Sequence, residues 1–198
     1  MAKTFSMQPA NSKQSITEFK IEDVAFGGKG VARDAGKAVF VPLTIDGERV
    51  TATIVREKKQ FAEAEVVELI ESSPHRVIPK CPYFGECGGC CYQHISYEHQ
   101  LELKARQVEQ AMRRIGRLAT PPMRPIVPSP LPYGYRNRIT VHAQDNVVGF
   151  YRRDVHRLMD IELPDCRPGR EPSSNQAPLH PRPRRSLRIA RESRVARF

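Results

Sequence analysis

Residues 27–42, which read GGKGVARDAGKAVFVP, are the part of the chain that says most about its fold class. Four glycines in this stretch lead into the apolar run 38–41. Before it, residues 16–24 alternate imperfectly between apolar and polar side chains. Alternation, a cluster of glycines and a renewed apolar run predict a strand, a glycine loop and a second strand.

Two further strand-like runs, residues 50–56 and 61–70, flank the basic turn EKKQ. The second run contains Ala and Glu, which favour helix, but its β-branched residues and its place after a hairpin turn favour strand. With HRVIP (residues 75–79) as a fifth strand, we expect residues 15–79 to form a small five-stranded barrel of the oligonucleotide-binding (OB-like) type. The polar residues 1–14 are expected to be disordered.

Four of the chain's five cysteines lie in residues 81–94, CPYFGECGGCCYQH. No secretory signal is visible, so we expect a cytoplasmic protein whose thiols stay reduced and bind a metal or cluster. Cys81, Cys87 and Cys90 are separated by five and then two residues, and 75 residues lie between Cys90 and Cys166. Zinc and an iron-sulfur cluster both accept four thiolates, so this spacing leaves both open.

One long helix is predicted over residues 96–117, with Ser96 as its N-cap and Gly116 as its stop. A connector with six prolines follows at residues 121–132. We then expect a small meander that delivers Cys166. Its predicted strands are residues 135–143, 147–153 and 155–163. The fold class is therefore mainly β with one long helix: the barrel, then a small α+β subdomain over residues 80–166.

The charge of the chain is concentrated at its C-terminal end. The formal net charge is +10, and residues 167–198 contain nine Arg, no Lys and two Glu, so they supply +7 of it. Composition indicates a disordered Arg/Pro-rich tail. Either an altered reading frame or a genuine arginine-rich RNA-binding tail explains the abrupt loss of lysine. No stretch of about 18 apolar residues is present, so no membrane span is expected.

The combination of GGKGVAR, VFVP, GERV, CPYFGECGGCCYQH, YRNR and GFYRRDVHRLMDIE closely resembles the N-terminal part of the RNA uracil-5 methyltransferases. The likeness is strongest to the iron-sulfur enzymes that form 5-methyluridine in ribosomal RNA. It implies that the barrel is a TRAM domain, an RNA-binding domain. It also implies a four-iron, four-sulfur (4Fe-4S) cluster held by Cys81, Cys87, Cys90 and Cys166, with Cys91 as a bystander.

The resemblance and the charge pattern indicate RNA contacts on the barrel and on the YRNR strand. Basic side chains in a glycine loop, at a hairpin tip and at alternate positions of one strand can meet phosphates. The candidates are Lys29, Lys58, Lys59, Arg136 and Arg138. The expected partner is RNA, in particular ribosomal RNA, and the chain is expected to be a monomer.

Members of the family also carry a domain that binds S-adenosylmethionine and supplies the catalytic cysteine and its base. We see no glycine-rich turn after a strand beyond residue 150, so we expect an N-terminal fragment with no catalytic residue of its own, inactive alone. The hypothesis is therefore an RNA-binding, iron-sulfur-carrying fragment of an S-adenosylmethionine-dependent RNA (uracil-5-)-methyltransferase. The alternatives are a stand-alone TRAM-type RNA-binding protein and a zinc-stapled structural domain.

Overall fold

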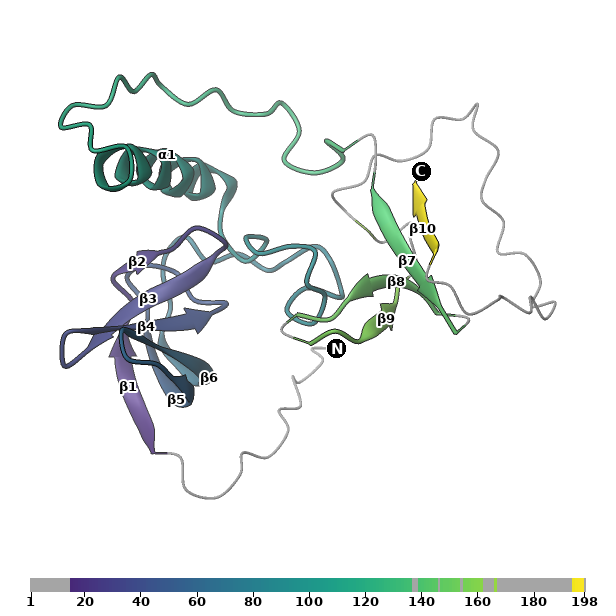
Figure 1. Ribbon diagram of the computed structural model, residues 1–198, viewed down its shortest axis with the longest axis horizontal. Coiled ribbons are helices and arrows are strands. Elements are labelled where there is room, and N and C mark those ends of the chain that lie inside the picture. The colour runs from purple at the N-terminus through teal and green to yellow at the C-terminus, as the bar shows by residue number, and fades with distance from the viewer. Residues whose placement is uncertain are drawn as a thin grey trace. The chain divides into compact units, whose positions relative to one another are not determined.

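The computed structural model describes residues 15–136, 139–145, 147–153, 155–161 and 166, together with the strand 194–197. This part of the chain is mostly β with one long helix, as predicted (Figure 1). It divides into two compact units, residues 1–76 and residues 77–198. No helix in the described part is long and apolar enough to cross a membrane.

The first unit is one curled sheet of six strands in the order β1-β5-β6-β4-β3-β2 (Figure 1). Every neighbouring pair is antiparallel except β4 and β6, which run parallel. The strands are β1 (Ile16–Lys20), β2 (Asp23–Val24), β3 (Lys29–Asp34), β4 (Lys37–Pro42), β5 (Arg49–Glu57) and β6 (Phe61–Glu71).

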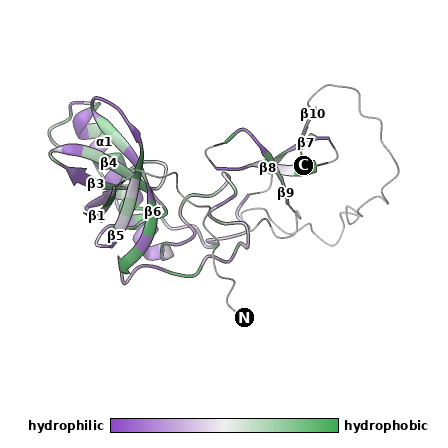
Figure 2. Ribbon diagram, turned by 90° about the horizontal axis from the view of Figure 1, so that it is seen from below, coloured by the Kyte–Doolittle hydropathy of each residue, from purple (hydrophilic) through white to green (hydrophobic). Residues whose placement is uncertain are grey.

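Alternation along these strands builds the core of the first unit. On β4, for example, Val39 and Val41 are fully buried, whereas Phe40 between them is only half-buried. Burying such side chains is the main stabilising contribution, about 1.5–3 kcal/mol for each large one. The core residues are Phe19, Ile21, Ala32, Val39, Val41, Val50, Ala52, Ala62 and Ala64. Along β6 the apolar side chains continue past this core, and Val67, Leu69 and Ile70 stay partly exposed (Figure 2).

The OB-like barrel over residues 15–79 is confirmed as a class, but its strand count differs from the prediction. The stretch 75–79 is not a strand; Arg76 instead forms an ion pair with the buried Glu48. The predicted strand 16–24 divides into β1 and the two-residue β2. The predicted glycine loop was wrong in part, because residues 29–34 form the strand β3. Packing explains the glycine at position 30 on β3, because a Cβ there would lie 2.0 Å from Thr44 Oγ1.

The second unit contains helix α1 (Tyr97–Arg114) and a four-stranded sheet in the order β10-β7-β8-β9. The predicted meander is confirmed as β7 (Thr140–Gln144), β8 (Val147–Tyr151) and β9 (Leu158–Asp160). Strand β10 (Arg194–Arg197) pairs with β7, so disorder does not hold for those four residues of the tail. The edge of β7 offers backbone N–H and C=O groups, and residues 194–197 form hydrogen bonds with them. The rest of the tail and residues 1–14 lie outside the described residues.

Helix α1 begins after Ser96 as predicted, although the Ser96 side chain makes no capping hydrogen bond. The spacing of Leu101, Ala105, Val108, Met112 and Ile115 predicts that these residues form the covered face of the helix, and this prediction was wrong. Val108 and Ile115 are 48% and 84% exposed, whereas His99 and Leu103 are buried. The sequence places apolar residues at both 101 and 103, on different faces of a helix, so periodicity alone does not decide which face is covered.

Candidate functional site

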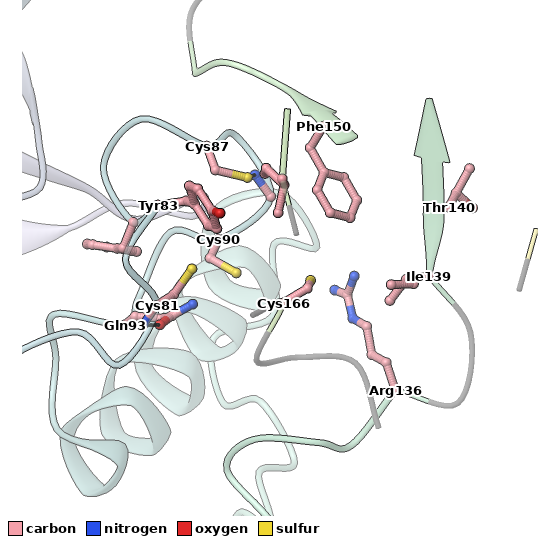
Figure 3. Close-up of a pocket in the computed structure, with 13 residues that line it drawn as sticks. Cys81, Tyr83, Cys87, Cys90, Gln93, Arg136, Ile139, Thr140, Phe150 and Cys166 are labelled. Atoms are coloured by element: carbon pink, nitrogen blue, oxygen red, sulfur yellow. Dashed lines mark hydrogen bonds between the residues drawn. The ribbon is translucent and has the colours of Figure 1, made fainter. Parts of the chain in front are cut away.

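The four predicted cysteine ligands line one cavity of about 300 Å³ in the second unit. Three of them come from the loop before α1, and Cys166 follows β9. In Figure 3 the loop cysteines Cys81, Cys87 and Cys90 lie on one side of the cavity and Phe150 and Arg136 on the other, with Cys166 between them. The other lining residues are Tyr83, Phe84, Gly89, Gln93, Arg136, Ile139, Thr140, Phe150 and Ile161.

Backbone hydrogen bonds hold the cysteine loop in tight turns and attach it to the sheet. The amide of Cys87 donates to the carbonyl oxygen of Tyr83 at 2.9 Å. Gly88 N–H donates to the Tyr151 carbonyl at 3.0 Å, at the end of β8. A Cβ on Gly88 would lie only 3.1 Å from that oxygen, which explains glycine at this close approach. The Arg152 guanidinium also contacts the Glu86 carboxylate at 2.7 Å.

Burial dominates the electrostatics of the thiols. It raises the pKa of Cys87 and of Cys90, and the neighbouring thiols raise both further. The Gly89 N–H opposes this at Cys87, because it donates to Sγ at 3.4 Å. In the described part of the chain, no three Cys, His, Asp or Glu side chains form a group that could hold a metal ion as they stand. The four cysteines thus lie around one cavity.

Gln93 lies in the wall of this cavity and links it to the start of the loop. Its Oε1 accepts a hydrogen bond from the Cys81 amide at 3.2 Å. Its amide group lies beside Cys90 and lowers the pKa of that thiol, though less than burial raises it. Nevertheless Nε2 is buried and makes no hydrogen bond of normal geometry within the described residues. A buried N–H donor without an acceptor costs about 1–3 kcal/mol. The Nε2 of Gln93 therefore favours a hydrogen-bond acceptor inside the cavity.

Two of the sequence predictions near the cavity have different outcomes. Cys91 is exposed and is not among the residues that line the cavity. Arg136, predicted to meet RNA, lies in the cavity wall, and its guanidinium points toward the side where Cys166 lies (Figure 3). It also lies 5.7 Å from the ring centre of Tyr135. Arg138 lies outside the described residues.

On the first unit, the structure separates the predicted RNA-binding lysines by their pairing. Lys29 Nζ is 3.0 Å from Glu63 Oε1, and this bond lowers the pKa of Glu63. The charge of Lys29 is therefore already balanced. Lys58 and Lys59 are exposed at the β5–β6 turn, and the described part of the chain gives them no ion-pair partner.

Sequence reasoning missed an aromatic pair on the outward side of this sheet. The rings of Phe40 on β4 and Phe61 on β6 meet edge to face, with centroids 5.7 Å apart. Arg56 lies next to them, 3.5 Å from Glu63. The signal was present in the sequence, because Phe40 alternates with buried valines and so must point away from the core.

Comparisons with known proteins identify the domain first. Residues 15–67 match the TRAM domain family. The first unit is therefore a TRAM domain, and the curled six-stranded sheet is its OB-like fold.

Longer proteins are similar to most of this chain. An uncharacterized RNA methyltransferase of Halalkalibacterium halodurans is 39% identical over 158 residues, which are 78% of this chain and 34% of that protein. One from Aquifex aeolicus is 41% identical over 150 residues, 76% of this chain and 35% of that protein. Over the part that these matches cover, the chain is similar to proteins named RNA methyltransferases. It spans about one third of the length of these relatives.

A solved structure supports the same conclusion. The crystal structure of tRNA (uracil-54, C5)-methyltransferase from Pyrococcus abyssi, in complex with S-adenosyl-L-homocysteine, aligns with a TM-score of 0.51 and 27% sequence identity. The alignment covers 77% of this chain and 33% of that one.

Proposed function

We propose that this chain is the RNA-binding, iron-sulfur-carrying part of an S-adenosylmethionine-dependent RNA (uracil-5-)-methyltransferase. The observation that carries the proposal is the single cavity lined by Cys81, Cys87, Cys90 and Cys166. The TRAM domain and the relatives named RNA methyltransferases support the RNA and methyltransferase parts. Ribosomal RNA as the substrate and 5-methyluridine as the product belong to the proposal for the whole protein.

The residues of the cavity fit a cluster. Four thiols are the donor set that a 4Fe-4S cluster takes, and the Gly89 N–H already donates to a sulfur, as amides around clusters do. The buried Nε2 of Gln93, beside Cys90, offers a further donor to sulfur in the cavity. Arg136 in the wall supplies a positive charge near the thiolates. When bound, the group would supply four metal-thiolate bonds that join the loop to Cys166, and so couple metal binding to folding.

RNA binding is proposed for the outward side of the TRAM sheet. Phe40 and Phe61 present aromatic surface there, and Lys58 and Lys59 present positive charge on the adjoining β5–β6 hairpin. Aromatic rings beside cations are the general means by which OB-type sheets bind unpaired nucleotides.

The metal content of the purified chain tests the cluster. Protein prepared without oxygen should be brown and contain about four iron atoms per chain, because four thiolates line one cavity. Cys87→Ser and Cys166→Ser should lose most of the iron and colour. Cys91→Ser is the matched control and should keep both. A colourless protein that contains one zinc per chain would contradict the cluster and favour a zinc-stapled domain.

A further inference from the structure

Three rings lie in a row on the sheet of the second unit, of which the last two are stacked. The rings of His142 on β7 and Tyr151 at the end of β8 have centroids 4.6 Å apart, at 44°. Tyr151 and His156, in the β8–β9 loop, are stacked at 4.1 Å and 21°. We call His142, Tyr151 and His156 the ring stack. A stack that ends in an exposed imidazole has one planar surface left open to solvent.

The three rings of the ring stack are not among the residues that line the cysteine cavity. Phe150 lines that cavity, and Tyr151 follows it in the same strand, so their side chains point to opposite faces. His142 pairs with Gly149, two residues before Tyr151, and therefore shares the face of Tyr151. Gly149 has no side chain to cover the rings. The ring stack is thus distinct from the proposed cluster site.

An exposed arginine follows the open end of the ring stack in the chain. Arg157 follows His156 directly and is exposed, and the described residues give its guanidinium no ion-pair partner. Its carbonyl oxygen accepts a hydrogen bond from Arg152 N–H at 2.9 Å, which holds the loop that carries His156. The carboxylate of Asp160 is on the same face, but it lies across from Gly149. A phosphate is therefore favoured at the Arg157 end of the stack and disfavoured at the Asp160 end.

We propose that the ring stack binds one unpaired base of an RNA strand on the outer face of His156, with the adjacent phosphate at Arg157. The inference rests on the proposed RNA binding and adds a base-stacking contact on the second unit. Planar rings in series next to a free guanidinium suit a nucleotide, since every base has a π face and carries a phosphate. Stacking does not distinguish one base from another, so this contact would strengthen binding of the RNA strand without selecting a sequence. Other parts of the protein would select the base.

Alanine variants of the full chain test the contact. Binding of a fluorescein-labelled, uridine-rich 12-nucleotide RNA is measured by fluorescence anisotropy. His156→Ala should weaken binding about tenfold, and Arg157→Ala several-fold, because stacking and a phosphate contact are lost. Arg124→Ala, an exposed arginine of the proline-rich connector, is the control and should bind as the unchanged protein does. Equal affinity of His156→Ala and the control would overturn the inference, while absence of binding by the unchanged protein would overturn the proposed RNA binding itself.

A fluorescence measurement separates stacking from charge. The chain contains no tryptophan, so Tyr151→Trp introduces a single indole into the ring stack. Its fluorescence should fall when the RNA binds and should not fall with an abasic oligonucleotide of equal charge. Tyr97→Trp in α1 is the control, and its fluorescence should not respond to either. Equal quenching by RNA and by the abasic strand would show a purely electrostatic contact and overturn the inference.

Discussion

Glu48 is the residue on which the end of the TRAM sheet depends. Its side chain is fully buried and accepts hydrogen bonds from the amides of Ile45 and Ser73, at 2.9 and 3.2 Å. Arg76 donates to both of its oxygens, at 2.6 and 2.7 Å, and to the Leu43 carbonyl at 2.8 Å. A buried carboxylate is tolerated only with such partners. The compact domain therefore extends to Arg76, past the family match that ends at residue 67.

Arg76→Ala should strongly destabilise the first unit. The change leaves the buried Glu48 carboxylate without its only cation among the described residues. Removing one partner of a buried pair costs about 3 kcal/mol or more, so the midpoint of urea unfolding should fall markedly. Arg49→Ala is the matched control, because Arg49 pairs with Glu18 in solvent and should have a much smaller effect. Equal losses in both variants would mean that Glu48 is stabilised mainly by the backbone amides.

At the level of elements, the second unit depends on the close approach of β8 and β9. Gly149 pairs with Asp160, and a Cβ on Gly149 would lie 2.0 Å from the carbonyl oxygen of Met159. That oxygen belongs to the backbone and cannot move without shifting β9. The pairing of these strands is what places Cys166, which follows β9, at the cavity.

Gly149→Ala should therefore separate β8 from β9. We expect a loss of about 1–3 kcal/mol in the stability of the second unit, the usual cost of overpacking. Because Cys166 would shift, the iron content should fall as well. Val148→Thr, at a neighbouring exposed position, is the control and should leave both quantities nearly unchanged. Thermal unfolding and iron analysis of both variants measure this; normal iron in Gly149→Ala would show that the cavity tolerates movement of β9.

The elements differ in how far the sequence determined them. Alternation and turns were enough for β4 to β6 and for the meander, because each has a half-buried pattern of its own. Strand β3 was missed, because its glycines predicted a loop. The residues around Arg76 looked like a strand because Val77 and Ile78 are apolar, yet the buried Glu48 takes Arg76 as a partner 28 positions away. Similarly, the sequence predicted that the four cysteines share one site. It gave no sign that Gln93 and Arg136 line the same cavity, because tertiary packing brings them there. Contacts between residues that are far apart in the chain do not appear as a periodic pattern in the sequence.

For the whole molecule, charge is distributed unevenly along the chain. Residues 167–198 supply +7 of the net +10, whereas the rest carries little excess charge. Many basic residues of the TRAM domain are already paired with Glu, as Lys29 with Glu63 and Lys37 with Glu57. The two units offer aromatic contacts, and the C-terminal segment offers most of the unspecific attraction for phosphate.

Removal of residues 167–198 should lower the salt dependence of RNA binding more than it lowers the affinity at high salt. Each lost phosphate contact reduces the slope of log K against log salt by about 0.7 for a single strand. Anisotropy titrations at several salt concentrations measure both slopes. Circular dichroism checks that β7 remains folded without its β10 partner. An unchanged slope in a folded variant would assign the electrostatic contact to the two units.

The pairing of Glu48 with Arg76 also has a consequence for synthesis on the ribosome. Strand β1 pairs with β5 and β4 with β6, so the sheet joins segments far apart in sequence, and such topologies fold slowly. Until Arg76 has left the exit tunnel, the Glu48 carboxylate has no cation and the sheet cannot close around it. The nascent TRAM domain should therefore stay protease-sensitive until the cysteine loop is already being translated.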